Sequence, residues 1–90
     1  MEETFEGRVM IRQAHVQVPA HARIVVNEQQ GWEIAFREEP GVQADFDETR
    51  LMQVALPTGK TGRFVQWRRN STHRLGIGVG WPPIVPQPGH

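Results

Sequence analysis

Large apolar and small or polar residues alternate most regularly along residues 73–81. A period of two with β-branched residues is typical of a β-strand. The two alternating sets are His73, Leu75, Ile77, Val79 and Trp81 on one side, and Arg74, Gly76, Gly78 and Gly80 on the other. We expect the first set to face the core and the glycine set to form a face of bare backbone on the other side of the strand.

Similar patterns predict six further short strands. They cover residues 5–12, 15–18, 21–27, 32–37, 51–56 and 62–69. Pro19 is expected to end the second of them, because proline cannot donate a hydrogen bond to a sheet ladder. A tight turn at Asn70-Ser71 joins the last two strands into a hairpin, residues 28–31 form another hairpin loop, and Pro40-Gly41 suits a turn.

Two segments have no clear strand pattern. Asp45 and Glu48 are spaced as in a capping box, so residues 45–50 are predicted to form either one short helical turn or an irregular acidic loop. Residues 82–90 contain four prolines, which predicts an extended C-terminal tail that is ordered only if it docks. The fold class expected is all-β: a small antiparallel barrel or sandwich of six to seven short strands, with residues 1–81 as its single domain.

The predicted glycine face has three possible explanations. An even-numbered hairpin loop would place Trp67 across from Gly76, where the aromatic ring would cover the bare backbone. Close approach of a partner subunit or of the proline tail is the second explanation, and a flat ligand is the third. The second explanation makes this face a candidate interface, formed by Gly76, Gly78, Gly80 and Trp81.

Length and composition limit the classes of protein. A chain of 90 residues forms one small domain with a modest core, so self-association is one way to bury more surface. The absence of cysteine removes disulfides and thiolate zinc sites. The N-terminus has no apolar stretch typical of a signal peptide, and no apolar run reaches the roughly 18 residues of a membrane span. We therefore expect a cytoplasmic protein without membrane contact.

Charge is unevenly distributed along the chain. Residues 1–48 contain all ten carboxylates and four arginines, a net charge of −6, whereas residues 49–90 carry six basic residues and no acid. This asymmetry either reflects neutralisation between neighbouring strands or indicates an anionic partner for the basic half.

The basic half supplies a candidate binding site for an anion or a nucleic acid. Nine of the ten basic residues are arginine, which pairs with phosphate or carboxylate through two hydrogen bonds and stacks on aromatic rings. The candidate residues are Lys60, Arg63, Trp67, Arg69 and Arg74. In the alternative interpretation, Trp67 is a core or covering residue and the arginines pair with acids such as Glu6 and Glu33.

Motifs for catalysis or metal binding are weak. Gly59-Lys60-Thr61 resembles the end of a phosphate-binding loop, but Val54 stands where the first glycine belongs and a strand follows instead of a helix. The spacing of the histidines fits no common zinc pattern: His15, His21, His73 and His90. Ser71 lies near His73 without an orienting acid, so we predict no enzyme, no catalytic residue, no cofactor and no metal.

The C-terminal half of the chain shows a recognisable order of elements. A strand ends in a turn at residues 56–59, a strand from Gly62 to Trp67 follows, and a glycine–valine strand at residues 76–79 closes the series. This succession is similar to the C-terminal half of PilZ-type barrels. The nucleotide-binding signatures of that family, a paired-arginine stretch and an Asp/Asn-x-Ser-x-x-Gly turn, are missing here, so the resemblance carries no cyclic-dinucleotide binding to this chain.

The function expected from the sequence is that of a small non-catalytic binding module. It would act by protein–protein contact or homo-oligomerisation, with a protein partner or a second copy of the chain. The alternative is anion or nucleic-acid binding through the basic residues and Trp67, and a small enzyme is the second alternative.

Overall fold

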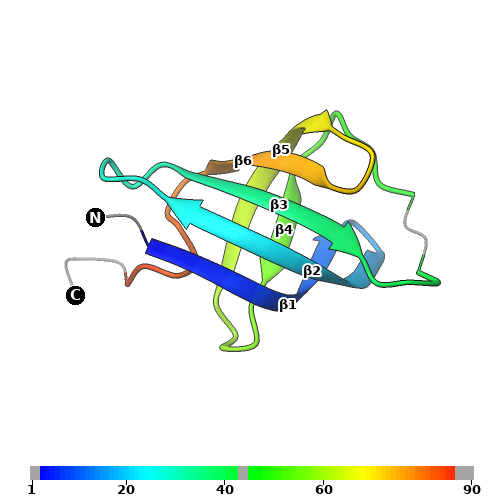
Figure 1. Ribbon diagram of the computed structural model, residues 1–90, viewed down its shortest axis with the longest axis horizontal. Helices are drawn as coiled ribbons and strands as arrows, with labels where there is room; N and C mark the ends of the chain where they lie inside the picture. Colours follow the sequence, from blue (N-terminus) through cyan, green and yellow to red (C-terminus); the bar gives the residue numbers. More distant parts are fainter. Residues whose placement is uncertain (1–2, 43–44, 87–90) are drawn as a thin grey trace.

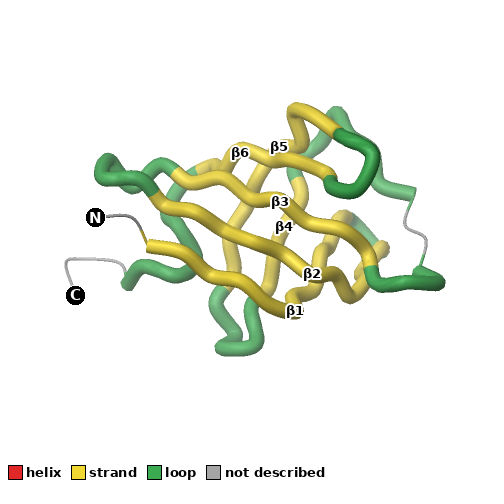
Figure 2. The backbone as a smooth tube through the Cα atoms, in the orientation of Figure 1, coloured by secondary structure: helices red, strands yellow, loops and turns green. Residues whose placement is uncertain are grey.

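The computed structural model describes residues 3–42 and 45–86, and these residues form an all-β protein without a helix (Figures 1 and 2). Hence no helix among them could cross a membrane. Six antiparallel strands close into a barrel in the order β1-β2-β3-β6-β5-β4, which confirms the predicted fold class and selects the barrel over the sandwich. The strands are β1 (Glu3–Gln13), β2 (Val16–Val26), β3 (Trp32–Glu38), β4 (Met52–Ala55), β5 (Thr61–Arg69) and β6 (Arg74–Val79).

The barrel is built from hairpins and one long connection. β1 and β2 form a long hairpin that pairs from Glu3↔Val26 to Gln13↔Val16, and β3 continues this sheet across the front of the view in Figure 1. The chain then crosses to β4, and β5 and β6 return as a hairpin that pairs with β3. In the described part of the chain, three residue pairs join β1 to β4 and close the barrel. They are Met10↔Ala55, Ile11↔Val54 and Arg12↔Gln53.

The core fills the barrel with alternate residues of every strand. Phe64 lies at its centre and makes edge-to-face contacts with Trp32 and Phe36, with ring centroids 6.4 and 5.6 Å apart. Small residues face these rings: Ala22 pairs with Phe36 across the β2–β3 ladder, and Gly78 pairs with Phe64 across the β5–β6 ladder. Alternating small and large residues in this way is how a narrow barrel accommodates aromatic side chains.

The glycine face of β6 lies inside the barrel, so its predicted orientation is wrong. A Cβ atom on Gly76 would lie 2.5 Å from the Phe64 ring, and one on Gly78 would fall within the Trp32 ring. The apolar face points outward instead, where Ile77 is 43% and Val79 39% exposed.

A β-bulge at Trp67 causes this inversion. Gln66 pairs with Gly76 and Arg68 pairs with Leu75, so the intervening Trp67 has no partner in the ladder. Because side chains alternate along a strand, one extra residue exchanges the two faces on either side of the bulge. Trp67 therefore does not cover Gly76 from the same side, as an uninterrupted ladder would require.

Pro19 does not end a strand. The predicted segments 15–18 and 21–27 are one strand, β2, in which Met10 faces Pro19 across the β1–β2 ladder. The Pro19 carbonyl accepts a hydrogen bond from the Glu39 N–H at 3.3 Å, beyond the last residue of β3. The carbonyl and nitrogen of a residue in an antiparallel strand point to the same neighbour, so the missing N–H of Pro19 costs β2 no hydrogen bond to β1.

Residues 45–50 contain no helix, in agreement with the loop alternative. The Arg50 N–H donates to the Asp47 carbonyl at 3.2 Å in a turn, and the Asp47 carboxylate accepts hydrogen bonds from the Thr49 N–H and hydroxyl at 2.9 and 2.6 Å. Residues 43–44 of the preceding segment lie outside the described part.

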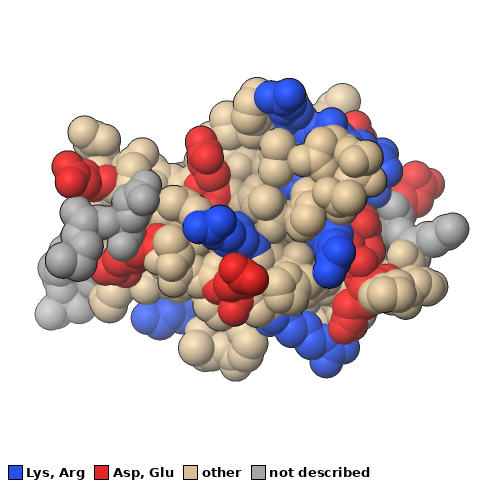
Figure 3. All heavy atoms as spheres, viewed as in Figure 1, with Lys and Arg blue, Asp and Glu red and all other residues tan. Residues whose placement is uncertain are grey.

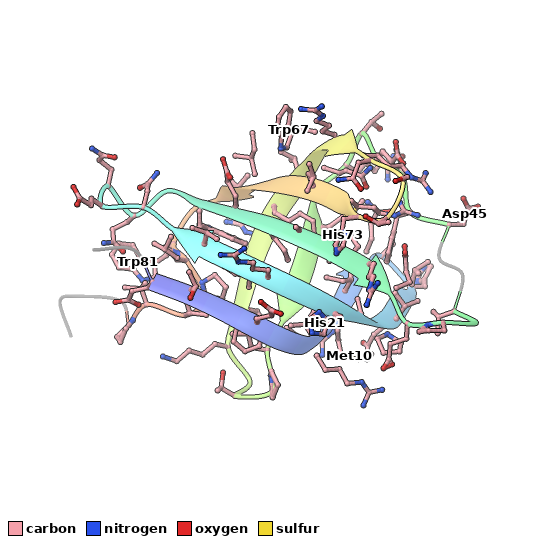
Figure 4. The ribbon with its side chains drawn as sticks, in the orientation of Figure 1. Met10, His21, Asp45, Trp67, His73 and Trp81 are labelled. Carbon is pink, nitrogen blue, oxygen red and sulfur yellow. The ribbon has the colours of Figure 1, made fainter. Side chains whose placement is uncertain are left out.

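The C-terminal segment closes one end of the barrel instead of extending from it. Pro82 and Pro83 are buried, and the Val85 N–H donates to the Pro82 carbonyl at 3.4 Å. The Trp81 indole N–H donates to the Val85 carbonyl at 2.6 Å. In Figure 4, Trp81 lies at the opposite end of the molecule from Asp45. Residues 82–86 are thus a docked turn that belongs to the domain, and residues 87–90 of the predicted tail lie outside the described part.

Candidate functional site

Trp67 points to solvent from the bulge in β5, on the same side as Arg63 and Val65, and Figure 4 shows its side chain projecting away from the barrel. It is 55% exposed, the highest value among the large hydrophobic side chains that are exposed in the described residues. The other three are Leu51, Ile77 and Val79, and the last two lie on β6, which pairs with β5. An exposed aromatic ring beside exposed aliphatic residues is a candidate contact surface.

This surface, which we call the apolar face, crosses four strands. The ladders place Ala35 beside Leu75 and Val65 beside Ile77. The outward side chains that define the apolar face are Val25, Ala35, Val65, Trp67, Leu75, Ile77 and Val79. A shallow groove of about 210 Å³ runs between β2 and Trp67, and Val25, Ala35 and Leu75 lie along it.

Charges of both signs lie at this groove. Arg23 and Glu33 both line it, and the described residues contain no ion pair of either side chain. Arg68 extends over the Trp67 ring, with its guanidinium carbon 5.9 Å from the ring centroid. Figure 3 shows the same mixture on the visible surface, where acidic and basic side chains are interspersed instead of separated by sign.

The five residues predicted to bind an anion do not converge. Arg74 is only 11% exposed by side chain, and its Nε lies 3.0 Å from a Glu38 carboxylate oxygen. Glu48 lies 3.6 Å from Arg74 and 3.5 Å from Arg69, so the two arginines share this carboxylate.

The remaining predicted residues are separated. Lys60 lies in the loop between β4 and β5, and Arg63 points outward from β5 opposite Gln53. Ion pairs between the acidic and basic halves of the chain thus account for part of the charge asymmetry, and Trp67 belongs to the apolar face.

The predicted interface residues also divide. Gly76 and Gly78 contact core rings with their inner side, so neither offers bare backbone for a partner in the way that the sequence suggested. Gly80 is exposed with a φ of +82°. Trp81 is half-buried against the C-terminal turn.

Metal-binding clusters and shifted pKa values are the next features of a candidate site. No three histidine or acidic side chains there are grouped so that they could hold a metal ion. A hydrogen bond from the Thr49 hydroxyl lowers the pKa of the Asp47 carboxyl, aided by the Thr49 N–H and by Arg50. The lowered pKa thus belongs to a carboxylate that accepts hydrogen bonds within an exposed turn.

The fold and this surface define a small closed β-barrel domain with an apolar outer face. Comparison of the chain with protein-family models, with curated proteins and with solved structures found no match.

Sequence reasoning missed Arg23 and Val25, which complete the apolar face from β2. Both alternate with the buried Ile24, so their outward direction was readable from the pattern. Their proximity to Trp67 was not, because it depends on the bulge and on the pairing of β3 with β6.

Proposed function

We propose that this chain is a non-catalytic protein-binding module that acts by self-association through its apolar face. The observation that carries the proposal is the outward position of Trp67, 55% exposed, at one end of a groove with apolar walls. Tryptophan and arginine are among the residues enriched at the energetic hot spots of protein interfaces, and Arg68 lies over the Trp67 ring.

The chemistry of the face favours a protein over an anionic polymer. Its centre is aliphatic, and Glu33 stands beside Arg23 at the groove. A phosphate backbone would be repelled by the carboxylate, and it would leave the aliphatic centre without contacts. A protein surface with an apolar centre and a charged rim matches both features.

The arrangement of charge favours a second copy of the chain as the partner. A two-fold symmetric pair brings residue i of one copy to residue j of the other and j to i. Arg23 and Glu33 point outward from adjacent strands. Two apolar faces related in this way can therefore place Arg23 of each copy against Glu33 of the other. Opposite charges would then face each other across the interface, without repulsion between the two copies.

Sedimentation velocity over a concentration series from micromolar to millimolar tests this proposal. The wild type should show a reversible increase in mass, and Trp67→Ala should weaken the dimer at least about tenfold. Leu51→Ala is the matched control, because Leu51 is 45% exposed but lies off the apolar face. A wild type that stays monomeric throughout, or a loss of association in Leu51→Ala equal to that in Trp67→Ala, would contradict the proposal.

A charge exchange tests the pairing itself. Arg23→Glu should weaken the dimer because it places carboxylates opposite one another, and the double variant Arg23→Glu/Glu33→Arg should restore it. A double variant as weak as the single one would remove the proposed symmetry while leaving the apolar contact in place.

The cytoplasmic location and the absence of a cofactor remain predictions from the sequence. Fractionation of cells that produce the chain checks the location.

A further inference from the structure

Three polar side chains form a row across the outer surface of β1, β4 and β5. Arg12 pairs with Gln53 in the β1–β4 ladder, and Gln53 pairs with Arg63 in the β4–β5 ladder. Ile11, Met52, Val54 and Phe64 beside them are buried in the core. Because side chains alternate along each strand, the row points outward, with one amide between two guanidinium groups.

The charges of the two arginines in this row are not balanced by an acidic side chain among the described residues. Arg8, Arg50, Arg69 and Arg74 each contact an acidic side chain. Neither Arg12 nor Arg63 has an ion pair with any described residue. The Arg12 Nε is moreover buried without a hydrogen-bond partner, although a buried guanidinium N–H normally has one.

Space for a ligand lies on both sides of Arg12. One depression of about 350 Å³ is bordered by Arg12, Gln53, Arg63 and Leu51. A second one, of about 370 Å³, is bordered by Arg12, Arg8, Met10 and Ala55. Both depressions are shallow and open to solvent, so they leave room for a small ligand beside Arg12.

We propose that the Arg12–Gln53–Arg63 row binds a phosphate-bearing small anion. Two guanidinium groups match the double negative charge of a phosphate monoester better than the single charge of a carboxylate, and each can donate two hydrogen bonds to its oxygens. The Gln53 amide adds a donor between them. Neither depression is bordered by an aromatic side chain, so this surface has no platform for stacked bases and favours a compact phosphate over a single-stranded nucleic acid.

Titration of the full chain with inorganic phosphate and pyrophosphate, followed by NMR, tests the proposal. The side-chain Nε–H signals of Arg12 and Arg63 and the Gln53 amide signals should shift together and saturate. Arg12→Gln and Arg63→Gln should each weaken binding at least about tenfold, because each removes a charge-assisted pair of hydrogen bonds. A single-stranded oligonucleotide of matched phosphate concentration should bind no more tightly than pyrophosphate.

Arg37→Gln is the matched control. Arg37 is an exposed strand arginine on β3, the strand farthest from β4 around the ring, and it has no described ion pair. This variant should bind phosphate like the wild type. Absence of saturable shifts, an equal loss in Arg37→Gln, or tighter binding of the oligonucleotide would each overturn the proposal. Circular dichroism of every variant separates lost binding from lost folding.

Discussion

The indole ring of Trp32 occupies the space in which a side chain of Gly78 would lie. Trp32 begins β3 and Gly78 is near the end of β6, and the Trp32 indole N–H donates to the Gly80 carbonyl at 3.3 Å. The ring is thus held flat against the inside of β6. Glycine at this position provides room for the largest side chain of the core.

Gly78→Ala should therefore destabilise the protein strongly. The added methyl group overlaps ring atoms that the 3.3 Å hydrogen bond holds in place, and overpacking of this kind costs about 3 kcal/mol of unfolding free energy. Chemical denaturation followed by tryptophan fluorescence measures it.

Gly7→Ala is the control for this substitution. Gly7 also lies within a strand, but an added Cβ would meet the Phe5 ring at 3.4 Å, an ordinary contact distance. Its stability should be unchanged or higher by up to about 1 kcal/mol, since alanine lowers the entropy of the unfolded chain. A Gly78→Ala variant as stable as Gly7→Ala would show that the Trp32 ring moves aside, and equal destabilisation of both variants would contradict the steric explanation.

The reversed faces of the β5–β6 hairpin mark the limit of what the sequence could predict. The alternation of Leu75, Ile77 and Val79 correctly indicated a strand. Which side faces the core depended on a single extra residue at Trp67, and a bulge has no unique sequence signature. The sequence of β6 alone does not show that its glycines face the core. The aromatic rings that fill the space beside these glycines come from β3 and β5.

Ala14→Gly should stabilise the protein. Ala14 begins the two-residue turn between Gln13 and Val16 and has a φ of +51°, which strains any residue with a Cβ by about 1 kcal/mol or more. Glycine removes that strain but enlarges the unfolded ensemble, so we expect a net increase of about 0.5 kcal/mol in thermal unfolding experiments. Ala35→Gly, in the middle of β3, should lower stability by about 1 kcal/mol, and a similar loss in Ala14→Gly would contradict the assignment of strain.

Arg74→Met should lower stability by about 3 kcal/mol. It leaves the Glu38 carboxylate, 18% exposed by side chain, without the cation beside it, and an isolated charge of this kind is costly. Arg69→Met is the control, because Arg69 is 61% exposed by side chain and lies 3.5 Å from Glu48, an acid that also contacts Arg74. An exposed pair contributes about 0.5 kcal/mol, so equal losses in urea denaturation would refute the distinction.

Thr49→Val should raise the pKa of Asp47 toward its ordinary value of 3.8, because the Thr49 hydroxyl is the main cause of the lowered pKa. A carboxyl whose folded pKa is lowered stabilises the fold above the unfolded pKa, and that contribution disappears as the pH falls through the folded pKa. The variant should lose the hydroxyl's share of this contribution at neutral pH and differ little from the wild type in strong acid. NMR titration of the Asp47 carboxyl carbon measures the shift.

The control for this titration is Thr72→Val. Thr72 donates to the uncharged side chain of Asn70 through the same pair of groups, its N–H and its hydroxyl. Asp47 should keep its lowered pKa in this variant, and a rise there would point to a general change of the fold.

Strand positions were more predictable than strand continuity and strand neighbours. Alternation located every strand, but it divided β2 at Pro19, because whether a proline interrupts a ladder depends on which neighbour its nitrogen faces. Glu38 and Glu48, which form ion pairs with Arg74, are distant from it in sequence. The sequence therefore could not show that Arg74, a predicted anion-binding residue, is paired within the protein. The row of Arg12, Gln53 and Arg63 likewise depends on register.

The short junction between Met10–Arg12 and Gln53–Ala55 makes the barrel uneven in its resistance to opening. Eleven residue pairs hold β1 to β2, whereas three hold β1 to β4. Local opening should therefore begin at the β1–β4 junction. The amide protons of this junction should exchange with solvent before those of β2. A phosphate bound by both Arg12 and Arg63 would bridge this junction. Phosphate binding should therefore slow the exchange of the amide protons along it.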